Sequence, residues 1–267
     1  MSTHARLRQY RDRLTDAVVP DELPPAPVGV TLVTLALWTV LLGGWLPMPS
    51  MPGPATAPGV FEAMGTSNGL AGALAYLLAW GTMMSAMMYP AMLPLVRRYT
   101  RESETDGWGA GAGVAALLLA YSSVWTAAGL VPLLVDALVG ISGLTAAHGP
   151  LLVGGLGLFV AWYQRTDHKR SALRECCGSV SFDGDALSLE QGARKGIDHG
   201  VECVRATWPL FALMVVAGSM NPVVMLGLTL VVTAERMPPW EDEMATAVGV
   251  AAGVGGLAVL LLPGLLP

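Results

Sequence analysis

Long apolar stretches without charged residues alternate with short polar segments along most of the chain. A transmembrane helix needs about 20 mostly apolar residues to cross the hydrocarbon core. Five stretches reach or approach that length: about 28–46, 68–96, 107–135, 145–163 and 244–262. The fourth is the weakest, because His148 and Pro150 lie in its first turns. The pattern predicts an all-α membrane protein, a polytopic transmembrane helical bundle.

The stretch 206–234 allows two interpretations. It is uncharged over 29 residues, which as one helix would be about 44 Å long and exceed the hydrocarbon core of about 30 Å. It also contains GSMNPV at 218–223, a pattern typical of a turn or a kink. One long kinked helix would give six spans. We prefer two helices, with the turn at Asn221–Pro222 and the first helix beginning near Glu190, which gives seven spans.

The positions of Lys and Arg predict the orientation of the bundle, since cytoplasmic segments are enriched in both. The segments before the first span, after the second and after the fourth are cationic, whereas the loops 47–67 and 136–144 contain neither residue. We therefore expect a multi-pass protein of the cell membrane with a cytoplasmic N-terminus. Its predicted organisation is a cytoplasmic amphipathic segment (1–27), transmembrane helices 1–4 (28–163), a cytoplasmic segment running into the next helix (164–205) and C-terminal transmembrane helices (206–267).

Composition supports the membrane class and excludes others. The chain is 53% hydrophobic and only 13% charged, whereas soluble domains carry about 25% charged residues. A net charge of −5 gives no footprint for nucleic acid. Three cysteines, Cys176, Cys177 and Cys203, do not make a disulfide framework. No nucleophile elbow or phosphate-binding glycine loop occurs, and we predict a protein that is not an enzyme.

A methionine-rich stretch, WGTMMSAMMYPAML at 80–93, is the first candidate for metal chemistry. Helical spacing places Met84 and Met88 on one face and Met83 and Met87 on the adjacent face. Thioethers are soft ligands suited to Cu(I). Methionine is also the adaptable filler of irregular cores, which is the commoner role. Both interpretations stay open.

A second candidate lies in IDHGVECVRATW at 197–208. His199 and Cys203 are four residues apart and share a helical face, and Cys176 lies on the same predicted side of the membrane. Imidazole and thiolate together suit zinc or copper. The alternative is a buried histidine with small apolar thiols at a helix interface.

Ionisable residues at the ends of apolar segments are weaker candidates. Glu202 lies at an inner boundary, and Glu235 and Arg236 end the stretch that begins at 206. Ionisable groups inside a bilayer are functional candidates, but groups at helix ends more often extend to water as anchors. Anchoring is therefore the expected role, with Glu235 the best exception.

The motifs together resemble an uncharacterised bacterial and archaeal family of predicted metal-binding integral membrane proteins. The resemblance covers about 80–239, through WGTMMSAMMYPAMLP, YQRTDHKRSALRECC, GIDHGVECV, GSMNPVVM and AERMPP. The matching positions include Met83, Met84, Met87, Met88, Met220, Asn221 and Glu235. The family pattern expects further cysteines where this chain has Ala172, Ala206 and Thr207. Either a three-ligand site of Cys176, His199 and Cys203 survives, or the scaffold is kept without the metal.

The resemblance favours a protein that binds or handles a soft transition metal, with copper the first choice and zinc the second. The alternative is a non-catalytic structural accessory subunit of a larger membrane complex, such as a copper-dependent oxidase or monooxygenase. The expected partners are the lipid bilayer and, under the alternative, membrane-protein subunits.

Overall fold

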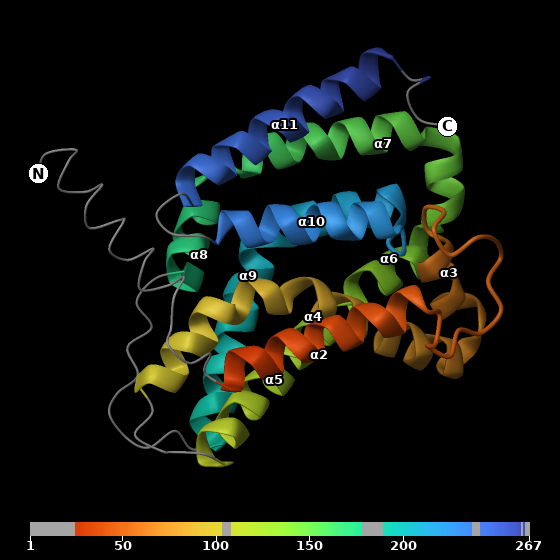
Figure 1. The fold of residues 1–267 in the computed structure, drawn as a ribbon. Helices are drawn as coiled ribbons and strands as arrows, with labels where there is room; N and C mark the ends of the chain where they lie inside the picture. Colours follow the sequence, from red (N-terminus) through yellow and green to blue (C-terminus); the bar gives the residue numbers. More distant parts are fainter. Residues whose placement is uncertain (1–24, 103–107, 178–188, 237–240, 263, 265–267) are drawn as a thin grey trace, which may run out of the picture.

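The computed structural model describes residues 25–102, 108–177, 189–236, 241–262 and 264. Their regular secondary structure is helical, without a strand (Figure 1), so the predicted all-α helical bundle is confirmed. The helices are α2 (Pro25–Leu42), α3 (Val60–Ser67), α4 (Gly69–Glu102), α5 (Trp108–Ala128), α6 (Leu130–Val139), α7 (Ile141–Tyr163), α8 (Asp167–Cys177), α9 (Leu189–Gly218), α10 (Pro222–Glu235) and α11 (Glu241–Leu261).

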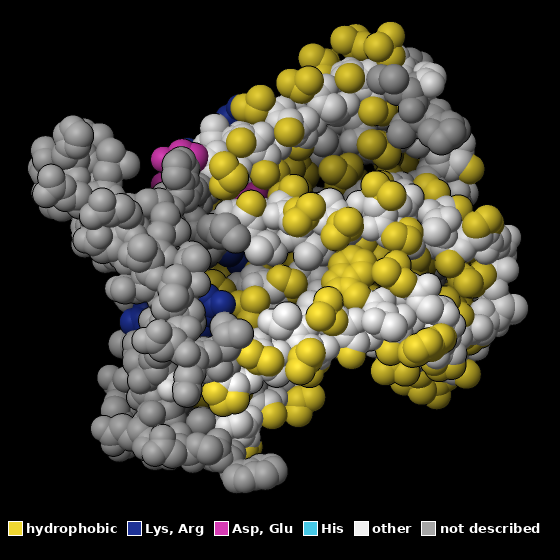
Figure 2. Space-filling view, in the orientation of Figure 1, with side chains coloured by type: hydrophobic (Ala, Val, Ile, Leu, Met, Phe, Trp, Pro, Cys, Tyr) yellow, Lys and Arg dark blue, Asp and Glu magenta, His cyan; other side chains and the backbone are white. Residues whose placement is uncertain are grey.

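Six described helical stretches are long and apolar enough to cross a membrane, which is compatible with membrane insertion. Large apolar side chains lie on the outer surface of the bundle, among them Leu70, Leu119 and Leu138, which are 77%, 71% and 82% exposed. Figure 2 shows apolar side chains spread over the helical body, whereas the coloured charged side chains visible on this face lie toward the α8 end. An outer surface with this many exposed apolar side chains is typical of helices surrounded by lipid or by another apolar partner.

The stretch 206–234 forms two helices, as preferred from the sequence. The first begins at Leu189 and ends at Gly218, and α10 begins at Pro222. The side chain of Asn221 caps α10 by accepting hydrogen bonds from the N–H groups of Val223 and Val224, at 3.0 and 3.4 Å. Proline suits the first helical position because it has no N–H to leave unpaired.

Helix α10 crosses the bundle but is short. Beside its start, Ser219 contacts Glu62 of α3, and at its end Glu235 contacts Lys169 of α8. Its 14 residues measure about 21 Å, less than the hydrocarbon core of about 30 Å. Six stretches therefore meet the length of a full span, and the preferred seventh falls short of it.

The third predicted span is divided at Gly129 into α5 and α6. Pro132 has no N–H to continue the ladder of hydrogen bonds there. A Cβ at Gly129 would lie 2.5 Å from Cδ1 of Trp80. Glycine at this position therefore allows α4 to pack directly against the break between α5 and α6. The structure also splits α7 locally, with non-helical backbone at His148 ahead of Pro150.

Close packing of α5 against α9 sets the position of the candidate site. Gly192, Gly196 and Gly200 form one stripe of α9 at four-residue spacing. A Cβ at Gly196 would lie 2.3 Å from the carbonyl oxygen of Leu117, and one at Gly192 would lie 2.4 Å from that of Gly113. The glycines therefore let the backbones of the two helices come into contact.

Candidate metal centre

Three sequence-predicted ligands meet where α8 packs on α9. The sulfur of Cys176 lies 3.2 Å from that of Cys203 and 3.7 Å from Nε2 of His199. One ligand atom of each residue lies within 4.8 Å of the others. All three side chains are buried, and neither cysteine forms a disulfide among the described residues. The structure thus brings together residues from two segments that are 23 positions or more apart.

The local sequence explains why two of the three donors, His199 and Cys203, lie next to each other. His199 and Cys203 are one helical turn apart on α9, on the face that approaches α5 and α8. Tyr121 of α5 packs on the imidazole of His199, with ring centroids 5.7 Å apart. Cys176 comes from the last turn of α8, whose Ala172 and Leu173 pack against Ala206 of α9 in a small apolar cluster.

The donor set fits a single soft ion. A thiolate–metal bond is about 2.3 Å long, so one ion can bridge two sulfurs up to about 4.6 Å apart. Thiolates select Cu(I) or zinc, and imidazole suits both metals. Structural zinc sites have four protein ligands, whereas the described cluster offers three Cys or His donors.

A buried arginine borders the cluster. Arg236, the residue after α10, is 4% exposed and interacts electrostatically with Cys176, Cys203 and Tyr121. Its three guanidinium nitrogens have no hydrogen-bond partner among the described residues, and neither has the hydroxyl of Tyr121. The sequence predicted an anchor that extends to water, and this prediction is wrong because the end of α10 packs inside the bundle.

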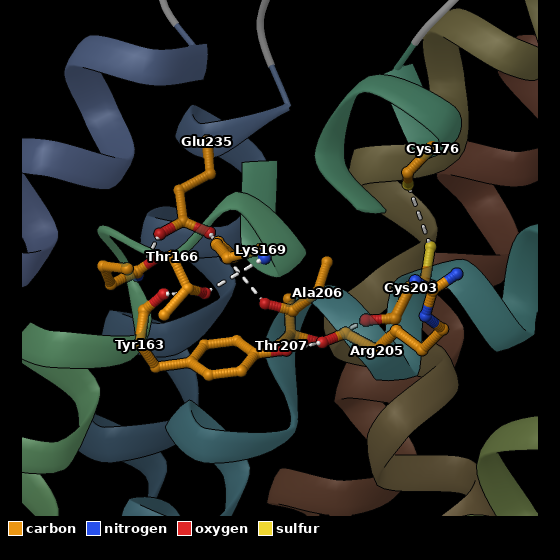
Figure 3. A network of polar contacts seen from close by, with 10 residues as sticks. Tyr163, Thr166, Lys169, Cys176, Cys203, Arg205, Ala206, Thr207 and Glu235 are labelled. Carbon is orange, nitrogen blue, oxygen red and sulfur yellow. Dashed lines mark hydrogen bonds and ion pairs between the residues drawn. The ribbon is translucent and has the colours of Figure 1, made fainter. Parts of the chain in front are cut away.

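Glu235 takes part in a second buried network next to the thiols (Figure 3). Nζ of Lys169 lies 2.7 Å from Oε2 of Glu235, and both side chains are fully buried. Gln164 donates to the other carboxylate oxygen at 2.5 Å, and Lys169 also donates to the carbonyl of Ala206 at 2.7 Å. Burial lowers the pKa of Lys169, and the charge of Glu235 opposes that shift. Glu235 is therefore the partner of an ammonium group, and is not an interfacial anchor.

A match to a known protein family identifies the family of the chain that carries this site. The family model described as PpoB2, copper chaperone, matches residues 77–259. That range is more than half of the chain and contains the three donors and Arg236. The chain belongs to the PpoB2 copper-chaperone family. No curated protein and no solved structure matches.

Membership in the PpoB2 family bears out the copper-related part of the resemblance found in the sequence. The three cysteine positions that the resemblance expected are all interior here. Ala172 and Thr207 are fully buried and Ala206 is 1% exposed. This PpoB2 protein therefore keeps a three-donor centre and has small side chains beside it.

The four candidate methionines lie in the core. Met83, Met84, Met87 and Met88 are fully buried in the hydrophobic cluster that also contains Cys176 and Cys203. A cavity of about 370 Å³ with apolar walls lies between α5, α6, α7 and α9, beside Trp80 of α4, and a second cavity lies between α4 and α5. Neither cavity has a methionine in its wall. The methionines are close-packed in this conformation, and their role as metal ligands stays a prediction.

The remaining candidates lie outside the three-donor cluster. Both carboxylate oxygens of Glu202 accept hydrogen bonds from Arg205 at 2.7 Å. Asn221 caps α10, and Met220 beside it is 9% exposed. These two residues follow the end of α9, which lies about 22 Å along the helix axis from Cys203.

At that far end lies a buried acid that was not among the candidate residues predicted from the sequence. Glu62 of α3 is fully buried, and its Oε1 accepts a hydrogen bond from Ser219 at 2.5 Å. Burial raises the pKa of Glu62 to about 7. The hydrogen bond from Ser219 opposes this rise in pKa, and the nearby carboxylate of Asp136 contributes a smaller part of it. The available signal was an acid between apolar residues in the sequence VFEAM.

Proposed function

We propose that this PpoB2 protein is a membrane copper chaperone that binds one Cu(I) ion through Cys176, His199 and Cys203. The observation that carries the proposal is the convergence of two buried thiols and an imidazole within 4.8 Å in a chain that belongs to a copper-chaperone family. The soft donors favour copper in its monovalent state.

A chaperone must also release its ion, and the two sulfurs differ in access. Cys176 is 6% exposed and lies in the last turn of a short helix, whereas Cys203 is fully buried in the middle of α9. A thiolate or imidazole of an acceptor protein would replace Cys176 first and Cys203 last. The family assignment and this ligand exchange both fit a protein without catalytic activity.

The membrane placement rests on the six long apolar stretches and on the distribution of Lys and Arg. It puts α8, α9 up to Cys203 and the copper site near the cytoplasmic face, with α3 on the opposite side. The acceptor would be a membrane protein that requires copper, such as an oxidase or a monooxygenase. A protein of this orientation delivers copper from the inner side.

Metal content of the purified protein tests the proposal. The detergent-purified, reduced protein should hold one copper per chain after exposure to Cu(I), measured by elemental analysis. Cys203→Ser removes a central donor and should abolish this stoichiometric copper. Cys177→Ser is the matched control, because it removes a thiol that is not one of the three donors, and it should leave the copper content unchanged.

The same measurement distinguishes the chaperone from the alternative function, a structural accessory subunit. A wild-type protein that takes up no copper and co-purifies with other membrane subunits would contradict the chaperone and support a structural accessory subunit.

A further inference from the structure

Arg236 is a buried charge that pairs with no carboxylate of the described residues. The structure has two buried cations among its described residues, Lys169 and Arg236. Lys169 is matched by Glu235, but the guanidinium of Arg236 has no hydrogen-bonded carboxylate. Burying an unpaired charge is strongly unfavourable. The guanidinium is attracted by the two thiols, once they ionise, and by the Tyr121 phenol, whereas the Lys169 ammonium repels it.

We infer that Arg236 is the charge partner of the loaded metal centre and makes it selective for a monovalent ion. The inference rests on the proposed function and adds the choice between Cu(I) and zinc. It makes Arg236 a specificity-determining residue that does not itself coordinate the metal.

The selectivity follows from counting charges. Metal binding requires both cysteines as thiolates, so two protons leave when an ion enters. Two thiols and Cu(I) give a dithiolate complex with a net charge of −1, and His199 contributes a neutral imidazole. The same donors and Zn(II) give a neutral complex. The guanidinium therefore stabilises the Cu(I) complex by direct attraction and gives the Zn(II) complex no comparable net stabilisation, because only the Cu(I) complex carries net charge.

The geometry favours arginine for this role. Its guanidinium stays protonated and offers five N–H donors. Three of its nitrogens are free of other described partners, so they can donate to sulfur once the thiolates form. Tyr121, whose hydroxyl is also unpartnered among the described residues, packs on His199 and closes the same side of the centre.

A pair of variants tests the inference. Arg236→Gln removes the charge and Arg236→Lys keeps it. Arg205→Gln is the matched control, because Arg205 lies two positions from Cys203 but pairs with Glu202 and is 36% exposed. Cu(I) affinity is measured by competition with bicinchoninate, and Zn(II) affinity with a zinc-binding dye, on detergent-purified protein. Circular dichroism checks that each variant is folded.

The expected result is a change in selectivity. Arg236→Gln should weaken Cu(I) binding by about 30-fold or more, as expected when one partner of a buried charge pair is removed, and change Zn(II) binding little. Arg236→Lys should keep most of the preference, and Arg205→Gln should keep all of it. Equal losses of Cu(I) and Zn(II) affinity in Arg236→Gln, or no loss, would overturn the inference. If the wild type binds no Cu(I), the proposed function fails first.

A measurement on the wild type covers the case in which Arg236→Gln does not fold. Ag(I) and Cd(II) are isoelectronic soft ions that differ by one charge. The ratio of Ag(I) to Cd(II) affinity should be higher for the protein than for dithiothreitol, which has two thiols and no cation. A ratio equal to or below that of dithiothreitol would overturn the inference.

Discussion

At the scale of single residues, the main feature of this protein is a set of buried thiol, imidazole and ionisable side chains. Helical spacing placed His199 and Cys203 on one face, and the structure brings Cys176, the third predicted donor, next to them. Lys169, Arg236 and Glu62 belong to segments that the sequence suggests are polar or interfacial, yet all three are buried. Their burial is what gives them chemical roles.

Glu62 gives a prediction about pH. Its pKa is about 7 in the folded protein and 4.5 ordinarily, so the folded state binds more protons than the unfolded state between these values. Stability should therefore fall as pH rises from about 4.5 to about 7, by up to about 3 kcal/mol. Glu62→Gln keeps the side-chain volume and should remove this fall in stability. Thermal unfolding in detergent at several pH values measures the effect.

Glu243→Gln is the control for this experiment. Glu243 is exposed in the first turn of α11, and its substitution should leave the pH dependence of unfolding as it is in the wild type. A Glu62→Gln protein with an unchanged fall in stability between those pH values would show that the buried acid does not carry it.

At the scale of elements, the glycine stripe of α9 and the end of α8 decide whether the donors meet. Backbone contact between α5 and α9 is possible because Gly192 and Gly196 have no Cβ. The residues Ala172 and Ala206, buried in one small cluster, hold α8 on α9 so that Cys176 reaches Cys203. The same stripe could have been noticed in the sequence, but which helix it faces could not, because a periodic face does not identify its neighbour.

Gly196→Ala tests the close approach. The new Cβ would lie 2.3 Å from the Leu117 carbonyl oxygen, which is backbone and cannot rotate away. The helices must separate, which should lower the free energy of unfolding by about 1–3 kcal/mol and weaken Cu(I) binding at His199. Unfolding in detergent and chelator competition measure the two effects.

Gly227→Ala is the matched control within α10, because nothing lies within 4 Å of a Cβ there. Alanine is favoured over glycine in a helix interior by about 1 kcal/mol, so this variant should be as stable as the wild type or more stable. Equal behaviour of the two variants would contradict the role of the α5–α9 contact.

At the scale of the whole molecule, the two ends of the bundle differ. The three donors, Arg236 and the Lys169–Glu235 pair lie at the α8 end, and Glu62 with Ser219 lies where α3 meets the turn before α10 (Figure 1). The buried methionines of α4 belong to the same core as the thiols. Under the proposed function, the end that faces the cytoplasm decides from which side copper would arrive.

Cysteine labelling tests the orientation. In a Cys177→Ser background, Ser67→Cys adds a thiol at the last residue of α3, and Arg174→Cys adds one on α8; both positions are exposed. A membrane-impermeant maleimide should label Ser67→Cys in intact cells and Arg174→Cys only after the cells are opened, because the cationic segments are expected inside. The reverse pattern would place the copper site outside.

The sequence by itself determined the helical segments and the break between Gly218 and Pro222, and it indicated three candidate donors, because hydrophobic length, turn chemistry and ligand type are local properties. It did not determine that Lys169, Arg236 and Glu62 are buried. Burial of a charge depends on which distant helices pack around it: Glu235 faces Lys169, and Arg236 faces two thiols. Only the tertiary structure decides such long-range pairings, and this packing brings the separate candidate ligands together beside one buried cation.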